Sequence, residues 1–154
     1  MTIVPLPTLG RKEAASAALA AKRRLQVSWT TIAKSLDRSL VWSTSAVLGQ
    51  QPLDAEQAHT LGRLLHLDDD VVDALQLPAV RGADVVDTTE PVVSRLHEMV
   101  HVYGSTLAEL IREEFGDGIM SAIDFELSFE RREDPKGDRV RLVWDGKFLP
   151  YRVF

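Results

Sequence analysis

The chain has 154 residues, of which 45% are hydrophobic and 27% are charged; its net charge is −5 and it contains no cysteine. This composition is typical of a globular protein with a buried core. The absence of cysteine excludes disulfides and thiolate metal sites, and the negative charge argues against strong nonspecific nucleic-acid binding. No apolar run approaches the roughly 18 residues that a membrane span needs, and Pro5 and Pro7 stand where a signal peptide would be apolar. We expect a cytoplasmic protein.

The first half of the chain predicts a bundle of short helices that follows a loose tail at residues 1–10. Helices are expected at residues 11–26, 29–36, 40–48, 55–67 and 71–77. Ser28 and Asp54 directly precede two of them and are favoured N-cap residues, and Gly49 ends the third. We therefore predict an N-terminal helical domain over residues 1–78.

Residues 79–90 mix Pro, Gly, Asp and Thr without a helical period, and we expect them to form an irregular connector. Pro91 suits the first turn of a new helix, which Gly116 ends. Gly104 and Ser105 lie within this helical pattern and are expected to interrupt or kink it. The pattern predicts one long helical segment with a central irregularity.

Beyond Gly116 the hydrophobic period changes to two, which is typical of strands. The alternating residues of the first strand are Ile119, Ser121, Ile123, Phe125, Leu127 and Phe129. Residues 133–138 predict a turn, residues 139–144 a second strand, and residues 145–146 a tight turn. Residues 91–154 thus form a C-terminal domain of one helical segment and two strands, and the fold class is α+β.

The C-terminal domain has only about 60 to 70 residues, which is marginal for an independent core. Two strands and one helical segment leave apolar surface uncovered. We therefore predict that this domain dimerises or assembles further.

The segment "WTTIAKSLDRSLVWSTSAVLG" resembles the helix-turn-helix of repressors. The helix that would read DNA, residues 40–48, contains no Arg, Lys, Asn or Gln, the side chains that bidentate base recognition uses. Lys34 and Arg38 are the nearby cations. We favour a packing module without DNA contacts, and a DNA-binding regulator remains the alternative.

A second motif, His97-Glu98-x-x-His101, fits the H-E-x-x-H pattern of zinc hydrolases. The two histidines are one helical turn apart, but a catalytic zinc also needs a third protein ligand. The downstream candidates are Glu113, Glu114 and Asp117. None belongs to a further metal-binding pattern, so we regard zinc chemistry as the weaker alternative.

A third set of residues is Arg95, Glu98 and Ser121. Arg95 and Glu98 are three positions apart on one helix face, where an ordinary ion pair is the simple interpretation. Ser121 lies on the apolar face of its strand, where a hydroxyl must find a partner. It is either a satisfied core serine or a donor aimed into a small pocket.

The segment "RLHEMVHVYGSTLAELIREEFGDGIMSAIDFEL", with the later "DGKFLP", resembles the core of the cyanase (cyanate hydratase) family. The resemblance continues upstream through "VLGQQPL", "DALQLP" and "RG", in one order over nearly the whole chain. It implies catalytic roles for Arg95, Glu98 and Ser121. The chain departs from the family pattern at Ser94, His97 and at residue 101, so both histidines of the zinc pattern lie at positions the family does not need.

The resemblance implies a helical bundle similar to repressor domains but not used on DNA, and a C-terminal domain that interlocks with a second subunit. Five such dimers would form a decamer with active sites between subunits. The expected reaction is attack of bicarbonate on cyanate, giving a dianionic adduct, then carbamate, and finally ammonia and carbon dioxide. Bicarbonate is a co-substrate, and neither a metal nor an organic cofactor is expected, nor a nucleic-acid or membrane partner.

Overall fold

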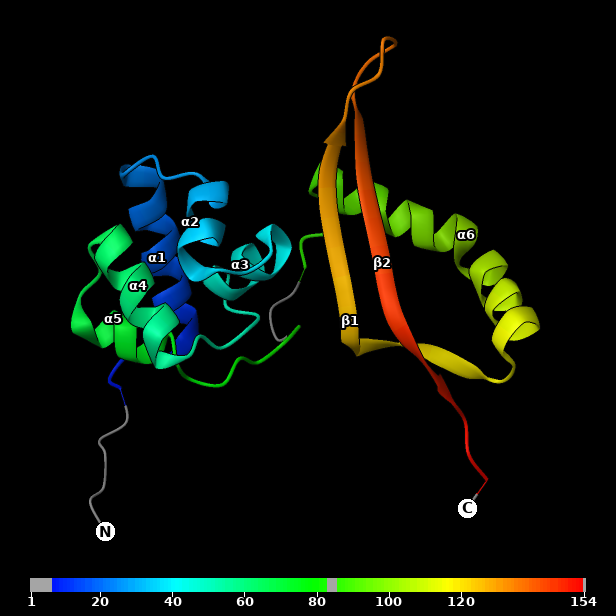
Figure 1. Ribbon diagram of the computed structural model, residues 1–154, viewed down its shortest axis with the longest axis horizontal. Coiled ribbons are helices and arrows are strands. Elements are labelled where there is room, and N and C mark those ends of the chain that lie inside the picture. The colour runs from blue at the N-terminus through cyan, green and yellow to red at the C-terminus, as the bar shows by residue number, and fades with distance from the viewer. Residues whose placement is uncertain (1–6, 83–85, 154) are drawn as a thin grey trace. The chain divides into compact units, whose positions relative to one another are not determined.

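The computed structural model describes residues 7–82 and 86–153, so residues 1–6 of the tail expected at residues 1–10 lie outside the described residues. Within them, helices precede two strands (Figure 1). The elements are α1 (Arg11–Arg24), α2 (Trp29–Leu36), α3 (Leu40–Val47), α4 (Ala55–Leu65), α5 (Asp69–Ala74), α6 (Pro91–Phe115), β1 (Gly118–Arg132) and β2 (Arg139–Pro150). The predicted α+β class is confirmed. The chain divides into two compact units. The first contains α1–α5, and the second contains α6 and the parts of β1 and β2 that lie outside residues 128–140.

Two helices of the first unit begin at the predicted caps. The Ser28 hydroxyl accepts a hydrogen bond from the Thr31 N–H at 3.1 Å. The Asp54 carboxylate accepts from the Gln57 N–H at 2.8 Å, and the Gln57 side chain accepts from the Asp54 N–H at 3.1 Å, which completes a capping box. These bonds satisfy backbone donors that a helix start leaves free, and they fix where α2 and α4 begin.

Four helices end earlier than predicted: α1, α3, α4 and α5. The largest difference is in α5, which spans Asp69–Ala74 where a helix over residues 71–77 is expected. In α1 and α4 the end coincides with the backbone leaving helical geometry. α1 ends at Arg24, shortly before Gln26 takes a φ of +53°. α4 ends at Leu65 because His66 takes a left-handed φ of +54°. Gly49, with a φ of +94°, follows α3 as expected for a residue that terminates a helix.

The core of the first unit is built from small and aliphatic side chains. Ala14, Ala18 and Ala21 are almost fully buried on one face of α1, so the alanine-rich sequence of this helix allows close packing. Gly62 serves the same purpose between α4 and α5, because a Cβ added there would lie 2.5 Å from a methyl group of Val72. Close approach of the short helices allows five of them to share one core.

Arg11 is a buried cation in this unit. Its guanidinium donates hydrogen bonds to the carbonyl of Ala46, near the end of α3, and to the carbonyl of Gln51 at 3.0 Å. Burial lowers the pKa of the guanidinium, and among the described residues its Nε and Nη1 atoms have no hydrogen-bond partner. A cation is favourable at the carbonyl end of a helix, so Arg11 joins the start of α1 to the end of α3.

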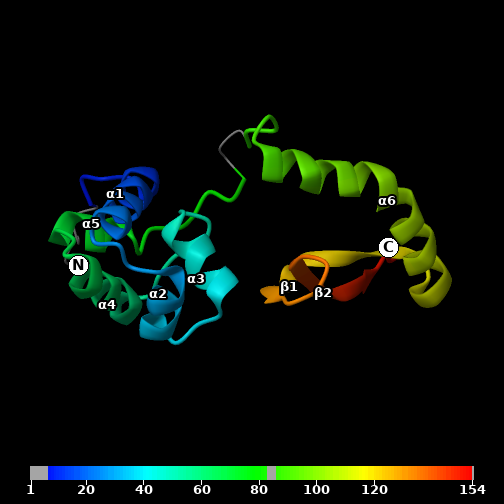
Figure 2. The same cartoon turned by 90° about the horizontal axis from the view of Figure 1, so that it is seen from above.

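α6 is the long helix of the second unit. The Glu90 carboxylate accepts a hydrogen bond from the Val93 N–H at 2.9 Å, and Pro91 occupies the first helical position. Helical geometry continues through Gly104, so no break occurs there: a single glycine costs a helix only about 1 kcal/mol. Figure 2 shows that the axis of α6 changes direction along its length. Gly116, with a φ of +93°, ends the helix as predicted.

β1 and β2 form a two-stranded sheet, and the short connection between them makes them antiparallel. The predicted turn at residues 133–138 is observed, with Gly137 at a φ of +119°. The predicted tight turn at residues 145–146 is wrong, because β2 continues through them to Pro150. Gly146 lies so close to β1 that a side chain there would clash with that strand. The glycine therefore permits close contact between the strands and does not mark a turn.

The second unit buries little of its apolar surface within one chain. None of the α6 residues is buried, and Ser121 is buried in β1. The exposed apolar side chains of α6 are Val92, Leu96, Met99, Val100, Val102, Tyr103, Leu107, Leu110 and Phe115. An exposed apolar surface of this extent is typical of a protein–protein interaction site. In the described part of the chain, no helix is long and apolar enough to cross a membrane.

Candidate active site

Arg95 and Glu98 form an ion pair on α6, as their spacing predicts. Arg95 Nη1 lies 3.1 Å from Glu98 Oε2, and the two side chains are 71% and 57% exposed. Arg95 Nη2 also donates to the Ser94 hydroxyl at 3.3 Å. An exposed pair of this kind contributes about 1 kcal/mol or less to stability. The pair therefore adds little to the stability of the fold, and the planar guanidinium is accessible on the surface of α6.

Ser121 lies in a different environment, near the beginning of β1. It is 5% exposed, whereas Ile123, two residues further on, is 96% exposed. The Ser121 hydroxyl accepts hydrogen bonds from the N–H groups of Ile123 at 3.1 Å and Asp124 at 2.9 Å. A regular strand does not bring these two N–H groups to one side chain, so the backbone turns a corner here, as Figure 1 shows for β1.

These hydrogen bonds restrict what the Ser121 hydroxyl can do. A hydroxyl has two acceptor lone pairs and one O–H donor. The N–H groups of Ile123 and Asp124 occupy the acceptor positions, and among the described residues no acceptor takes the Ser121 proton. Ser121 is therefore prepared to donate a hydrogen bond and poorly prepared to act as a base or nucleophile. An alternating strand pattern gives no indication of this geometry.

The structure brings two of the three predicted site residues together within one chain. Arg95 and Glu98 are in contact, but in the described residues no hydrogen bond or ion pair joins either of them to Ser121. The permanently charged guanidinium and the hydroxyl donor are both suited to anionic oxygens.

The zinc pattern is placed on the exposed surface of α6. His97 and His101 are both exposed. Among residues 7–82 and 86–153, no group of three His, Cys, Asp or Glu side chains is arranged to hold a metal ion. A zinc site at these histidines would have to obtain its third protein ligand from outside that set.

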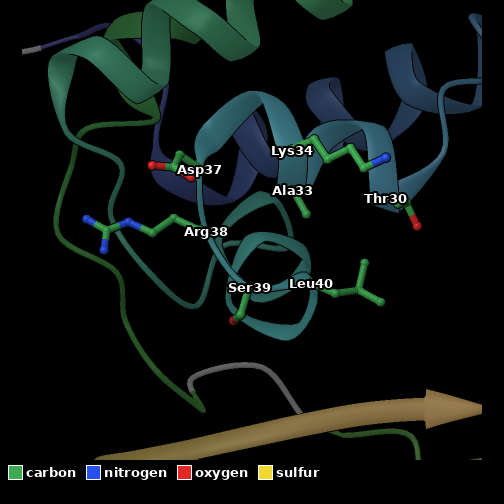
Figure 3. Close-up of a pocket in the computed structure, with 7 residues that line it drawn as sticks. All are labelled: Thr30, Ala33, Lys34, Asp37, Arg38, Ser39 and Leu40. Carbon is green, nitrogen blue, oxygen red and sulfur yellow. The ribbon is translucent and has the colours of Figure 1, made fainter.

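The helix-turn-helix shape predicted for the first unit is present, but its surface chemistry is not that of a DNA reader. Asp37, with a φ of +50°, makes the turn between α2 and α3. A surface pocket of about 380 Å³ lies between these helices, and Figure 3 shows Lys34 and Arg38 extending from it in different directions. Arg38 lies over the ring of Trp42, 5.4 Å from its centroid. The positive charge is therefore dispersed, and α3 carries no basic residue.

Two family models match nearly the whole chain. Residues 11–78 match the model described as the N-terminal domain of cyanate hydratase, and residues 85–153 match that of the cyanate lyase C-terminal domain. Similar curated proteins include the cyanate hydratase of Thiobacillus denitrificans, which is 48% identical over 94% of this chain and 99% of its own length. That of Ralstonia pickettii is 46% identical over the same shares. The crystal structure of cyanase from T. urticae has a TM-score of 0.77 at 35% identity and covers 89% of this chain and 96% of its own.

Proposed function

The chain belongs to the cyanate hydratase family, and on this premise we propose that it decomposes cyanate in a bicarbonate-dependent reaction to ammonia and carbon dioxide. The observation that carries the assignment is the 48% identity to a cyanate hydratase, which extends over 94% of this chain and 99% of that protein. A lyase acting on cyanate follows from family membership. Bicarbonate, carbamate and the assembly are the further parts of the proposal.

The proposed reaction joins two small anions. An oxygen of bicarbonate attacks the cyanate carbon, and the bicarbonate proton passes to nitrogen, which gives a dianionic adduct. Cleavage of the bond between the bridging oxygen and the former bicarbonate carbon releases carbon dioxide. One proton then converts the remaining dianion to carbamate, and a second allows carbamate to break down to ammonia and carbon dioxide. The site must therefore stabilise two negative charges and supply two protons.

Arg95 and Ser121 suit these demands in different ways. The Arg95 guanidinium is permanently charged and planar, so it can bind two carboxylate-like oxygens of the adduct at once. Ser121 contributes an O–H donor whose oxygen already accepts two hydrogen bonds, which strengthens it as a donor. Because the serine lone pairs are engaged, we assign it to binding charge and not to covalent attack.

Glu98 is negative and therefore unsuited to binding the anions directly. Its contact with Arg95 at 3.1 Å supports a role in orienting the guanidinium. Because Glu98 contacts the guanidinium that we propose binds the anions, we also assign its carboxyl group a part in proton transfer. The two roles are compatible, because a protonated carboxyl still accepts a hydrogen bond from arginine.

We further infer that the active site is completed between subunits. Ser121 has no polar contact with Arg95 or Glu98 among the described residues, and α6 exposes nine large apolar side chains. A dimer that covers α6, repeated five times in a decamer, would bury this surface and bring charges from several chains to one site. Such an enzyme, without cysteine, suits the cytoplasm.

The decisive experiment measures ammonia released from cyanate by the purified protein, with bicarbonate either removed or added back. We expect release to depend on both substrates and to saturate with each. Ammonia release that does not depend on bicarbonate would contradict the proposed adduct, and no release under any condition would contradict the activity.

A gel-shift with genomic fragments at moderate salt tests the DNA-binding alternative, and we expect no specific retention.

Replacing both histidines of the zinc pattern tests whether a metal takes part. We expect the His97→Ala, His101→Ala double variant to keep cyanate-dependent ammonia release, because neither side chain has an assigned role in holding the anions. A chelator should likewise leave the wild-type rate unchanged. Metal analysis of the purified protein provides an independent readout. Loss of activity in both experiments, with stoichiometric zinc in the wild type, would restore the zinc hypothesis.

A further inference from the structure

Gly146 lies on β2 against the corner at which Ser121 is held. A Cβ atom added to Gly146 would lie 2.6 Å from the carbonyl oxygen of Ser121 and 2.5 Å from Cγ of Met120. Real Cβ atoms do not approach other atoms this closely. A methionine side chain can move, but a backbone carbonyl within a paired strand cannot move without moving its own residue. Any side chain at position 146 would therefore displace Ser121.

The backbone of Gly146 does not itself require glycine. Its φ lies outside the left-handed region that Gly116 and Gly137 occupy. An alanine would be compatible with the local backbone, so space alone excludes it. The contact with β1 therefore accounts for the glycine.

A second glycine brings the same two strands together at the other side of the corner. A Cβ atom added to Gly118 would lie 2.4 Å from the carbonyl oxygen of Leu149. The corner of β1 is thus enclosed by β2 on both sides, at Gly118 and at Gly146. This close approach is consistent with the burial of Ser121, which is 5% exposed on a hairpin whose other residues are largely exposed.

We propose that Gly146 is a positioning residue for Ser121, which rests on the proposed function of that serine. Because Gly146 has no side chain, β2 can approach the Ser121 carbonyl. This contact fixes the backbone at the corner, where the Ser121 hydroxyl accepts hydrogen bonds from two N–H groups. The direction of the remaining O–H donor then follows from the corner. Moving the Ser121 carbonyl would turn the donor away from the oxygen that it binds.

The test is a Gly146→Ala variant of the full chain, with kcat and KM measured for cyanate and for bicarbonate. A displacement of about 1 Å at a catalytic donor costs about 100-fold in rate, so we expect kcat to fall by about that factor. The two KM values should change much less, because Arg95 still binds the anions. Gly137→Ala is the matched control. An added Cβ atom there would have no other atom within 4 Å, so the substitution strains only the backbone of the hairpin turn. It should leave kcat unchanged.

A double-mutant cycle separates positioning from a general loss of structure. Adding Gly146→Ala to a Ser121→Ala variant should cause no further loss of kcat, because the donor is already absent. Equal losses in both backgrounds would overturn the proposal, as would full activity of Gly146→Ala. If Gly146→Ala does not fold, adding Met120→Ala removes the side-chain clash and leaves the carbonyl clash, and the same comparison applies. Failure of the proposed function would instead appear as an inactive wild type.

Discussion

The Arg95→Lys variant is expected to lose about 100-fold or more in kcat/KM for cyanate while its assembly and its unfolding temperature stay near those of the wild type. Lysine keeps the positive charge but replaces a planar fork of donors with a single charged point. Preorganised donors aimed at developing charge are each worth about 10² to 10³ in rate. The loss of stability should be small because the Arg95–Glu98 pair is largely exposed in the single chain.

The same helix provides a matched control. Arg112 Nη1 lies 2.8 Å from Glu109 Oε1, an ion pair with the same spacing of three residues and similar exposure. Arg112→Lys should therefore leave kcat/KM unchanged. Steady-state assays should be paired with size-exclusion chromatography, so that a lost subunit contact is not mistaken for lost chemistry. Wild-type turnover by Arg95→Lys would remove the arginine from the proposed mechanism.

Ser121→Ala should lower kcat by about 10² to 10³, the usual consequence of removing one preorganised donor to developing negative charge. The substitution also leaves the N–H groups of Ile123 and Asp124 without this acceptor, but both residues are exposed, so water can take its place and the cost to stability should be small. We therefore expect kcat to fall much more than the free energy of unfolding. Because Gly146 holds the same corner from β2, we expect the strand pairing to survive.

Ser128, further along β1, is exposed and provides the control. Ser128→Ala should change neither activity nor stability measurably. Single-turnover measurements would show whether the Ser121 loss lies in the chemical step. A Ser121→Ala enzyme with the wild-type kcat would show that the buried hydroxyl serves only the strand corner.

The sequence predicts most of the helical architecture because the relevant interactions are local. Ser28 and Asp54 cap their helices through bonds that reach only three residues along the chain. The same holds for Arg95 and Glu98, which a helical repeat alone brings together. Local rules fail where a distant segment decides the outcome. Asp145-Gly146 has the composition of a turn, yet these two residues continue β2, with β1 lying opposite Gly146.

The environment of Ser121 could not be predicted for the same reason. Its position between Ile119 and Ile123 suggests a regular strand with three inward side chains, but Ile123 is almost fully exposed. The hydroxyl itself takes up two backbone N–H groups and turns the strand. In the proposed assembly, Ser121 reaches Arg95 and Glu98 through contacts between chains, and no local pattern of residues encodes such contacts.

The uncovered apolar face of α6 has a consequence for the behaviour of the protein in dilute solution. If subunits cover that face, the stability of the C-terminal half becomes a function of protein concentration and not of sequence alone. The helical bundle, with its own core, does not share this dependence. In that case the N-terminal half of a newly made chain would fold at once, whereas the C-terminal half would become stable only after association. The total activity would then rise more steeply than the protein concentration.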